Sequence, residues 1–169
     1  MSTGEKHSLR SSEREEYIEY ILLAELCSYG WQNDRFVEVA RAQTDAFGYD
    51  LVLSAEGYTR HVQLKASIES GKARSQKINR GLERKASACV IWMKVHPDTL
   101  RPLLFGWFGD LPGKPLPDLG QRRAKHTKGN ADGKKLERPN LREVAWSSFE
   151  ELKSTAEVFD RLFGPKLGE

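Results

Sequence analysis

The spacing of apolar and polar residues near the start of the chain predicts a helix followed by a strand. The helix runs from near Glu13 to about Tyr29. Ser11 or Ser12 can cap its start, and the early glutamates complement the positive end of the helix dipole. Residues 35–40 form a short run with aromatic and β-branched side chains, so they predict a first strand.

Two further strands are predicted to form a hairpin. Residues 49–54 (YDLVLS) and 58–66 (YTRHVQLKA) flank Glu56-Gly57, a pair suited to a tight turn. With these two residues as the loop, Asp50 lies directly opposite Gln63 on the neighbouring strand.

Alternation along the strands assigns the hairpin side chains to two faces. One face is apolar and is predicted to meet the core; it holds Leu51, Leu53, Val62 and Leu64. The other face gathers a carboxylate, an amide and an ammonium group; it holds Asp50, Val52, His61, Gln63 and Lys65. Such groups are costly to bury unless something binds to them, so this face predicts a binding site.

The rest of the chain predicts further helices and strands. A basic helix is predicted over Ser75–Ala86, and buried strands are predicted over Ala88–Val95 and Pro102–Phe108. Prolines and glycines among basic residues predict a long loop from Asp110 to Pro139. A strand at Arg142–Trp146 and one or two helices within Ser148–Phe163, capped by Ser147 or Ser148, complete the prediction.

This order of elements predicts an α/β fold, a three-layer sandwich with a central mixed β-sheet and helices packed on it. A chain of 169 residues is expected to form one domain over residues 1–169. Its core is expected over about 11–108, with a basic loop over about 110–140 and the C-terminal strand and helices over about 142–163.

Composition indicates a globular protein of the cytoplasm. Apolar residues make up 38% and charged residues 30%, a balance that excludes a disordered or membrane-embedded chain. No apolar run is long enough to span a membrane, and the first ten residues lack a secretory signal, so no membrane partner is expected. Cys27 and Cys89 lack zinc-site spacing and are expected to be reduced core residues.

Charge is unevenly distributed along the chain. The net charge is only +3, but residues 72–85 and 121–138 each carry a local charge of +5, whereas residues 13–25 carry −4. The basic stretches can contact phosphates, although a solvated helix and a disordered loop are equally simple interpretations. The candidate nucleic-acid contacts are Lys72, Arg74, Lys77, Arg80, Arg122, Arg123, Lys125 and Lys128.

The polar face of the hairpin has the groups that phosphodiester hydrolysis needs. Mg²⁺ binds oxygen ligands, often one or two carboxylates with water and a phosphate, and Mn²⁺ can take its place. Asp50 can supply the carboxylate, and Gln63 can bind the metal or orient water. Lys65 can stabilise negative charge on the transition state.

These residues resemble the signature of the PD-(D/E)XK nuclease superfamily. Gly48-Tyr49-Asp50-Leu51-Val52 followed by Val62-Gln63-Leu64-Lys65 is similar to its D…(E/Q)xK motif, in the Q-x-K variant. The superfamily includes restriction endonucleases, archaeal Holliday-junction resolvases and intron-encoded homing endonucleases. The resemblance covers residues 13–95 and implies a restriction endonuclease-like fold, and it departs from the consensus where neutral Gln63 replaces an acid.

The resemblance also implies an acid on the preceding helix and, by analogy with many relatives, a homodimer. In similar members the acid lies about three turns before a Gly-aromatic pair, and Gly30-Trp31 then points to Glu19 as a catalytic and metal-binding residue. Glu15 and Glu25 are open alternatives.

The sequence therefore predicts a metal-dependent endonuclease that acts on duplex or branched DNA. The alternative is a nuclease-like module that binds nucleic acid or another partner without cleavage, with Gln63 as the mark of lost chemistry. Metal dependence distinguishes the two hypotheses.

Overall fold

The computed structural model describes residues 9–44, 46–126 and 135–166. The larger of two sheets consists, in spatial order, of β1 (Glu38–Arg41), β2 (Leu51–Ala55), β3 (Tyr58–Ile68), β5 (Ala88–Val95), β6 (Pro102–Gly109) and β9 (Glu150–Leu152). The smaller sheet consists of β4 (Ser75–Asn79), β8 (Glu137–Ala145) and β7 (Arg123–Lys125). Among the described residues, the α-helices are α2 (Ser11–Gln32) and α3 (Thr155–Phe163), and the 3-10 helices are η1 (Arg80–Arg84) and η2 (Trp146–Ser148). Only β3 and β5 pair in parallel among the described strands of the larger sheet, so this sheet is mixed.

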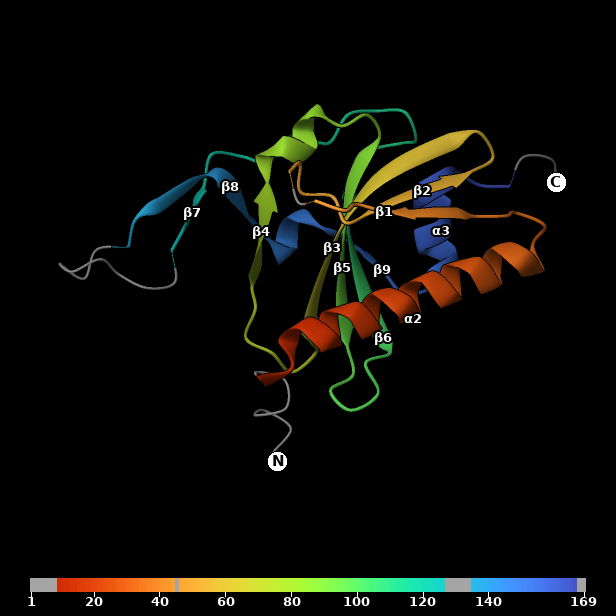
Figure 1. Ribbon diagram of the computed structural model, residues 1–169, viewed down its shortest axis with the longest axis horizontal. Coiled ribbons are helices and arrows are strands. Elements are labelled where there is room, and N and C mark those ends of the chain that lie inside the picture. The colour runs from red at the N-terminus through yellow and green to blue at the C-terminus, as the bar shows by residue number, and fades with distance from the viewer. Residues whose placement is uncertain (1–8, 45, 127–134, 167–169) are drawn as a thin grey trace.

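The larger sheet is covered by helices on one face and by the smaller sheet on the other (Figure 1). On the helical face, Leu51, Leu53 and Val62 pack with apolar residues of α2 and α3. On the opposite face, Val90 and Trp92 pack with residues of β4, η1 and β8, namely Ile78, Leu82 and Val144. Each fully buried large apolar side chain is worth about 1.5–3 kcal/mol. Burial on both faces explains why β5 has an almost continuous apolar sequence.

The α/β class and the mixed central sheet are confirmed. The predicted helix is present as α2, and the predicted strands at 49–54, 58–66, 88–95 and 102–108 are present as β2, β3, β5 and β6. The hairpin register is confirmed as well, because Leu51 pairs with Val62. Glu56 and Gly57 both have positive φ, which is the backbone conformation of a tight two-residue turn.

The ends of the first helix differ from the prediction. Arg10, rather than Ser11 or Ser12, occupies the N-cap position, and its side chain makes no capping hydrogen bond within the described residues. The helix continues past Tyr29 through the buried residue Gly30. A Cβ atom at Gly30 would lie 2.3 Å from the Arg35 carbonyl oxygen, so glycine here permits the chain to turn back against the helix. The strand predicted at 35–40 begins and ends later in the chain, as β1 over Glu38–Arg41.

The prediction of a basic helix over Ser75–Ala86 is wrong. This segment forms β4 and then η1, and the Asn79 side chain accepts a hydrogen bond from the Gly81 amide at the start of η1. The cause is tertiary, because β4 pairs along its whole length with β8, a strand much later in the chain. That pairing, together with burial of Ile78 and Leu82, outweighs local helix propensity.

The predictions for the C-terminal third also need correction. The expected loop from Asp110 to Pro139 contains β7 and the first residues of β8. The segment predicted as one or two helices holds β9 before the single helix α3. Ser154, not Ser147 or Ser148, caps α3 in a reciprocal capping box with Glu157.

The two cysteines have different surroundings. Cys89 is buried, as predicted, and burial raises the pKa of its thiol to about 12. Cys27 is exposed on α2, which contradicts its prediction as a core residue. Neither of the α-helices described here combines the length and apolar character needed to cross a membrane.

Candidate functional site

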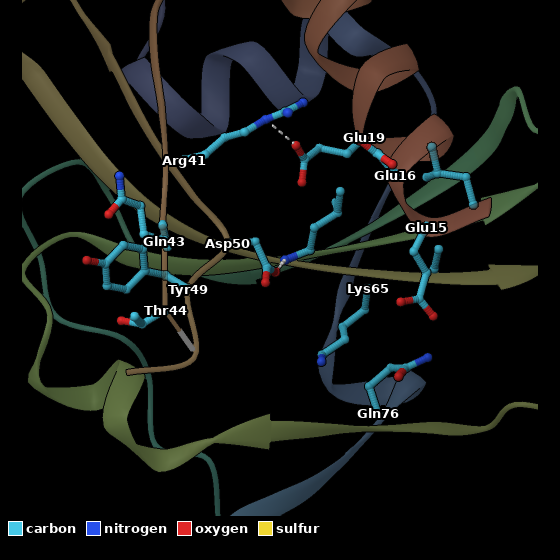
Figure 2. Close-up of a pocket in the computed structure, with 14 residues that line it drawn as sticks. Glu15, Glu16, Glu19, Arg41, Gln43, Thr44, Tyr49, Asp50, Lys65 and Gln76 are labelled. Atoms are coloured by element: carbon cyan, nitrogen blue, oxygen red, sulfur yellow. Dashed lines mark hydrogen bonds and ion pairs between the residues drawn. The ribbon is translucent and has the colours of Figure 1, made fainter. Parts of the chain in front are cut away.

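A cleft opens where β3 extends beyond its neighbour β2. Within the described part of the chain, β2 pairs with β3 no further than Val62, whereas β3 runs on to Ile68. The cleft has a volume of about 590 Å³ and lies between the first turns of α2, the segment after β1, the exposed edge of β3, and β4. Figure 2 shows that Glu19 of α2, Asp50 just before β2 and Lys65 of β3 all reach the cleft.

Asp50 is held at the edge of the cleft by backbone hydrogen bonds. Its amide donates to the Val62 carbonyl and its carbonyl accepts from the Ala42 amide, each at 2.9 Å. Its carboxylate Oδ2 accepts a hydrogen bond of 2.7 Å from the amide of Leu64, a β3 residue just past the end of the hairpin pairing. The side chain thus takes the place of a missing strand partner and is fixed beside the β3 edge.

Glu19 projects from α2 into the same cleft. Its carboxylate forms an ion pair with the Arg41 guanidinium at 2.8 Å, and its side chain is only 19% exposed. Burial raises the pKa of Glu19; the charge of Arg41 opposes this shift and the charge of Asp50 adds to it. Two carboxylates therefore share a partly desolvated space, at an electrostatic cost that a bound cation would offset.

Lys65 extends from β3 toward the opposite wall of the cleft. It is half-buried, and its side chain points toward Gln76 of β4, away from the glutamates of α2 (Figure 2). The cleft consequently has carboxylates along one wall and an ammonium group near the other. A phosphate between them would meet positive charge on one side and a metal held by the carboxylates on the other.

Gln63 is not among the residues that line the cleft. It shares one face of β3 with Lys65, as predicted, but it is only 4% exposed and lies on the face that the smaller sheet covers. Its Oε1 atom is buried and has no hydrogen-bond partner among the described residues. An unsatisfied buried carbonyl is costly, so this oxygen marks a place where an additional donor or a cation would be stabilising.

The alternatives for the helical acid occupy different places. Glu15 lines the cleft one turn before Glu19, and Glu16 lies beside it. Glu25 lies away from the cleft, where its carboxylate accepts a hydrogen bond of 2.8 Å from the Thr155 hydroxyl and so joins α2 to α3. Glu19 interacts electrostatically with Asp50, because the charge of that carboxylate contributes to its raised pKa.

Sequence reasoning missed several cleft residues. These are Arg41, Gln43, Thr44, Tyr49 and Gln76. Of these residues, only Tyr49 could have been suspected from the sequence, because it is the neighbour of Asp50. The others come from the end of β1, from the segment that follows it and from β4, and only the tertiary arrangement brings them to the cleft.

The predicted nucleic-acid contacts lie on the smaller-sheet side of the molecule. Lys72 and Arg74 precede β4, Lys77 is in β4, Arg80 is in η1, and Arg122, Arg123 and Lys125 lie at β7. Lys128 lies outside the described residues. Lys77 Nζ donates to the Lys125 carbonyl at 3.0 Å, which joins β4 to β7 across the sheet.

The donor set of the cleft is compatible with Mg²⁺. In the described chain no group of three or more His, Cys, Asp or Glu side chains is placed to hold a metal. Mg²⁺ commonly uses only one or two protein carboxylates and completes its shell with water and phosphate. Asp50 and Glu19 provide two such carboxylates on one cleft, and the charge of Asp50 contributes to the raised pKa of Glu19.

Comparison with models of known protein families, with curated proteins and with solved structures finds no match. A functional assignment for this chain therefore rests on the cleft and on the charges around it.

Proposed function

We propose that the protein is a metal-dependent endonuclease that hydrolyses phosphodiester bonds in DNA. The observation that carries this proposal is the convergence of Glu19, Asp50 and Lys65 on one cleft. Two carboxylates and an ammonium group in one cleft suit a reaction in which a divalent cation and a phosphate meet. The basic side chains beside the cleft, from Lys72 to Lys85, suit a polyanionic substrate.

Asp50 and Glu19 would hold the metal, whereas Gln63, which lies outside the cleft, is not assigned as a ligand. When bound, Mg²⁺ supplies Lewis acidity toward phosphate oxygens and makes water more acidic. The protein's own groups supply the rest. Lys65 places positive charge where the phosphate gains negative charge in the transition state, and the Arg41 ion pair orients Glu19.

The first test is cleavage of supercoiled plasmid with Mg²⁺, with Mn²⁺ and with EDTA. We expect nicking with either metal and none with EDTA. Lys65→Ala and Asp50→Ala should each lower the rate by at least about 100-fold, the decrease typical when a group that stabilises transition-state charge is removed. Lys153→Ala, which removes an exposed lysine between β9 and α3, is the matched control and should cut normally.

Circular dichroism would establish that the variants are folded. Cleavage by folded Lys65→Ala at the wild-type rate would refute the proposed mechanism. Plasmid nicking that persists in EDTA would refute the metal requirement.

The second candidate is a nucleic-acid-binding module without catalysis. It is favoured by one observation, namely that the Q-x-K glutamine is neutral and buried outside the cleft. Such a module would bind DNA with strong salt dependence, and neither Mg²⁺ nor Mn²⁺ would produce fragments.

A further inference from the structure

The smaller-sheet side of the molecule carries a concentrated excess of positive charge. Residues 72–85, 122–126 and 135–143 contain 12 Lys and Arg side chains against three Glu. Their local charge is +9 in a chain whose net charge is +3, so the remainder of the chain is net acidic. Such an uneven distribution of charge attracts a large anion to the smaller-sheet side and repels it from the α2 face.

Part of this basic side of the molecule is a two-stranded ribbon that extends beyond the body of the fold. The ribbon is formed by β7 and the first residues of β8. β8 pairs with β4 over Leu141–Ala145, whereas the earlier residues Glu137 and Arg138 pair with β7. The ribbon therefore continues past the end of β4, as Figure 1 shows for β7 and β8.

The base of the ribbon is fixed by a buried arginine. The register shifts between Arg123 and Ala124, where β8 has extra residues. The Arg142 guanidinium, only 6% exposed, donates to the carbonyl of Pro139 at 2.9 Å and so satisfies the bulged backbone. This hydrogen bond gives the ribbon a defined direction relative to β4.

The basic side chains of the ribbon are available to a partner. Arg123, Lys125, Lys135 and Arg138 are all exposed. Arg123 is paired with Glu137 at 3.0 Å, but an exposed pair of this kind is worth about 0–1 kcal/mol and is easily exchanged for a phosphate.

We propose that this ribbon binds in the major groove of duplex DNA, with its basic side chains on the flanking phosphates. The inference rests on the proposed function in taking DNA as the partner, and it specifies duplex rather than single-stranded substrate. The major groove of B-form DNA, about 12 Å wide, admits a two-stranded ribbon. The deep, narrow major groove of duplex RNA does not.

Composition favours duplex over single-stranded DNA for a second reason. Single-strand binding depends on aromatic side chains that stack on the bases. The sequences of β4, β7 and β8 contain no aromatic residue. β4 also connects the ribbon to the cleft, because Gln76 lines the cleft and the neighbouring Lys77 donates to the Lys125 carbonyl of β7.

The test is fluorescence anisotropy in EDTA, so that binding is measured without cleavage. The probes are a labelled DNA duplex of about 20 base pairs, which is about two helical turns, one of its single strands, and an RNA duplex of the same sequence. Wild-type protein should bind the DNA duplex at least about tenfold more tightly than either other probe. Its affinity should fall steeply as salt is raised.

The ribbon variant is Arg123→Gln with Lys125→Gln and Arg138→Gln. It should bind the DNA duplex at least about tenfold more weakly, and the slope of log K against log salt should become shallower by about one for each phosphate that the protein no longer neutralises. The control removes three exposed charges elsewhere, by Arg101→Gln with Lys153→Gln and Lys166→Gln, and should retain the wild-type slope.

Two outcomes would overturn the inference. One is a ribbon variant with the affinity and slope of the wild type, and the other is equal affinity for the duplex and the single strand. Neither depends on catalysis. Absence of metal-dependent nicking, with duplex binding abolished only in the ribbon variant, would refute the nuclease and leave the ribbon assignment standing.

Discussion

At the scale of single residues, the cleft places Glu19 where its charge is unfavourable to the fold. Burial and the neighbouring Asp50 carboxylate raise its pKa, and the ion pair with Arg41 compensates only in part. Groups kept in such surroundings are often functional, because selection for stability alone would replace them.

Glu19→Gln should therefore become more stable than the wild type as pH rises. With a raised pKa, the folded protein holds this proton to higher pH than the unfolded chain does, so ionisation of Glu19 disfavours folding. The two proteins should have the same stability below the usual pKa of a glutamate. The wild type should become less stable than Glu19→Gln as pH rises through the raised pKa. Urea unfolding midpoints from about pH 4 to pH 8 would measure the difference.

The opposite trend would contradict this interpretation of Glu19. A wild type that gained stability over Glu19→Gln with rising pH would show that the Arg41 ion pair dominates. Glu38→Gln, on the exposed strand β1, is the matched control and should show no such trend.

At the scale of elements, α3 is attached to the larger sheet by an arginine from β3. Arg60 is fully buried, and its guanidinium donates to the carbonyls of Arg161 and Leu162 in the last turn of the helix and to the carbonyl of Asp110. A cation at this end of a helix is favoured by the helix dipole. Burial lowers the pKa of the guanidinium, which reflects the desolvation that these hydrogen bonds offset.

Arg60→Met should destabilise the fold by about 2–4 kcal/mol. The substitution removes the donor but leaves three carbonyl groups behind, and each buried acceptor without a partner costs about 1–3 kcal/mol. Urea denaturation would measure the change, with the exposed Arg101→Met as the control. An unchanged midpoint would show that water reaches these carbonyls.

At the scale of the whole molecule, the proposed binding of a metal in the cleft would be coupled to global unfolding. A ligand that binds only the folded state stabilises it by an amount set by its concentration and affinity, about 1.4 kcal/mol at ten times Kd. Asp50 is fixed by the β2–β3 hairpin and Glu19 by α2, so the proposed metal joins two elements that are distant in sequence.

Mg²⁺ should raise the Tm of the wild type and leave that of Asp50→Ala unchanged. The effect should saturate with Mg²⁺ concentration, and NaCl at matched ionic strength should not reproduce it. Differential scanning calorimetry would provide the measurement. An equal rise in both proteins would show that Mg²⁺ acts elsewhere than at this cleft.

The sequence by itself determined the elements that depend on residues close together in the chain. The Glu56-Gly57 turn and the two-residue alternation set the hairpin register, and that register brings Asp50 beside β3 and puts Lys65 farther along the same strand. The helical spacing of α2 likewise predicted its existence, and the apolar run of β5 predicted a buried strand.

The tertiary structure decided what depends on partners far along the chain. Residues 75–79 form a strand because β8 pairs with them, and that pairing carries Gln76 to the cleft and creates the base of the ribbon. Gln63 is buried because the smaller sheet covers its face, and Arg41 reaches Glu19 only when β1 joins the sheet. Periodicity within a segment records which face is apolar, but the free energy of long-range pairing and burial determines what that segment finally packs against.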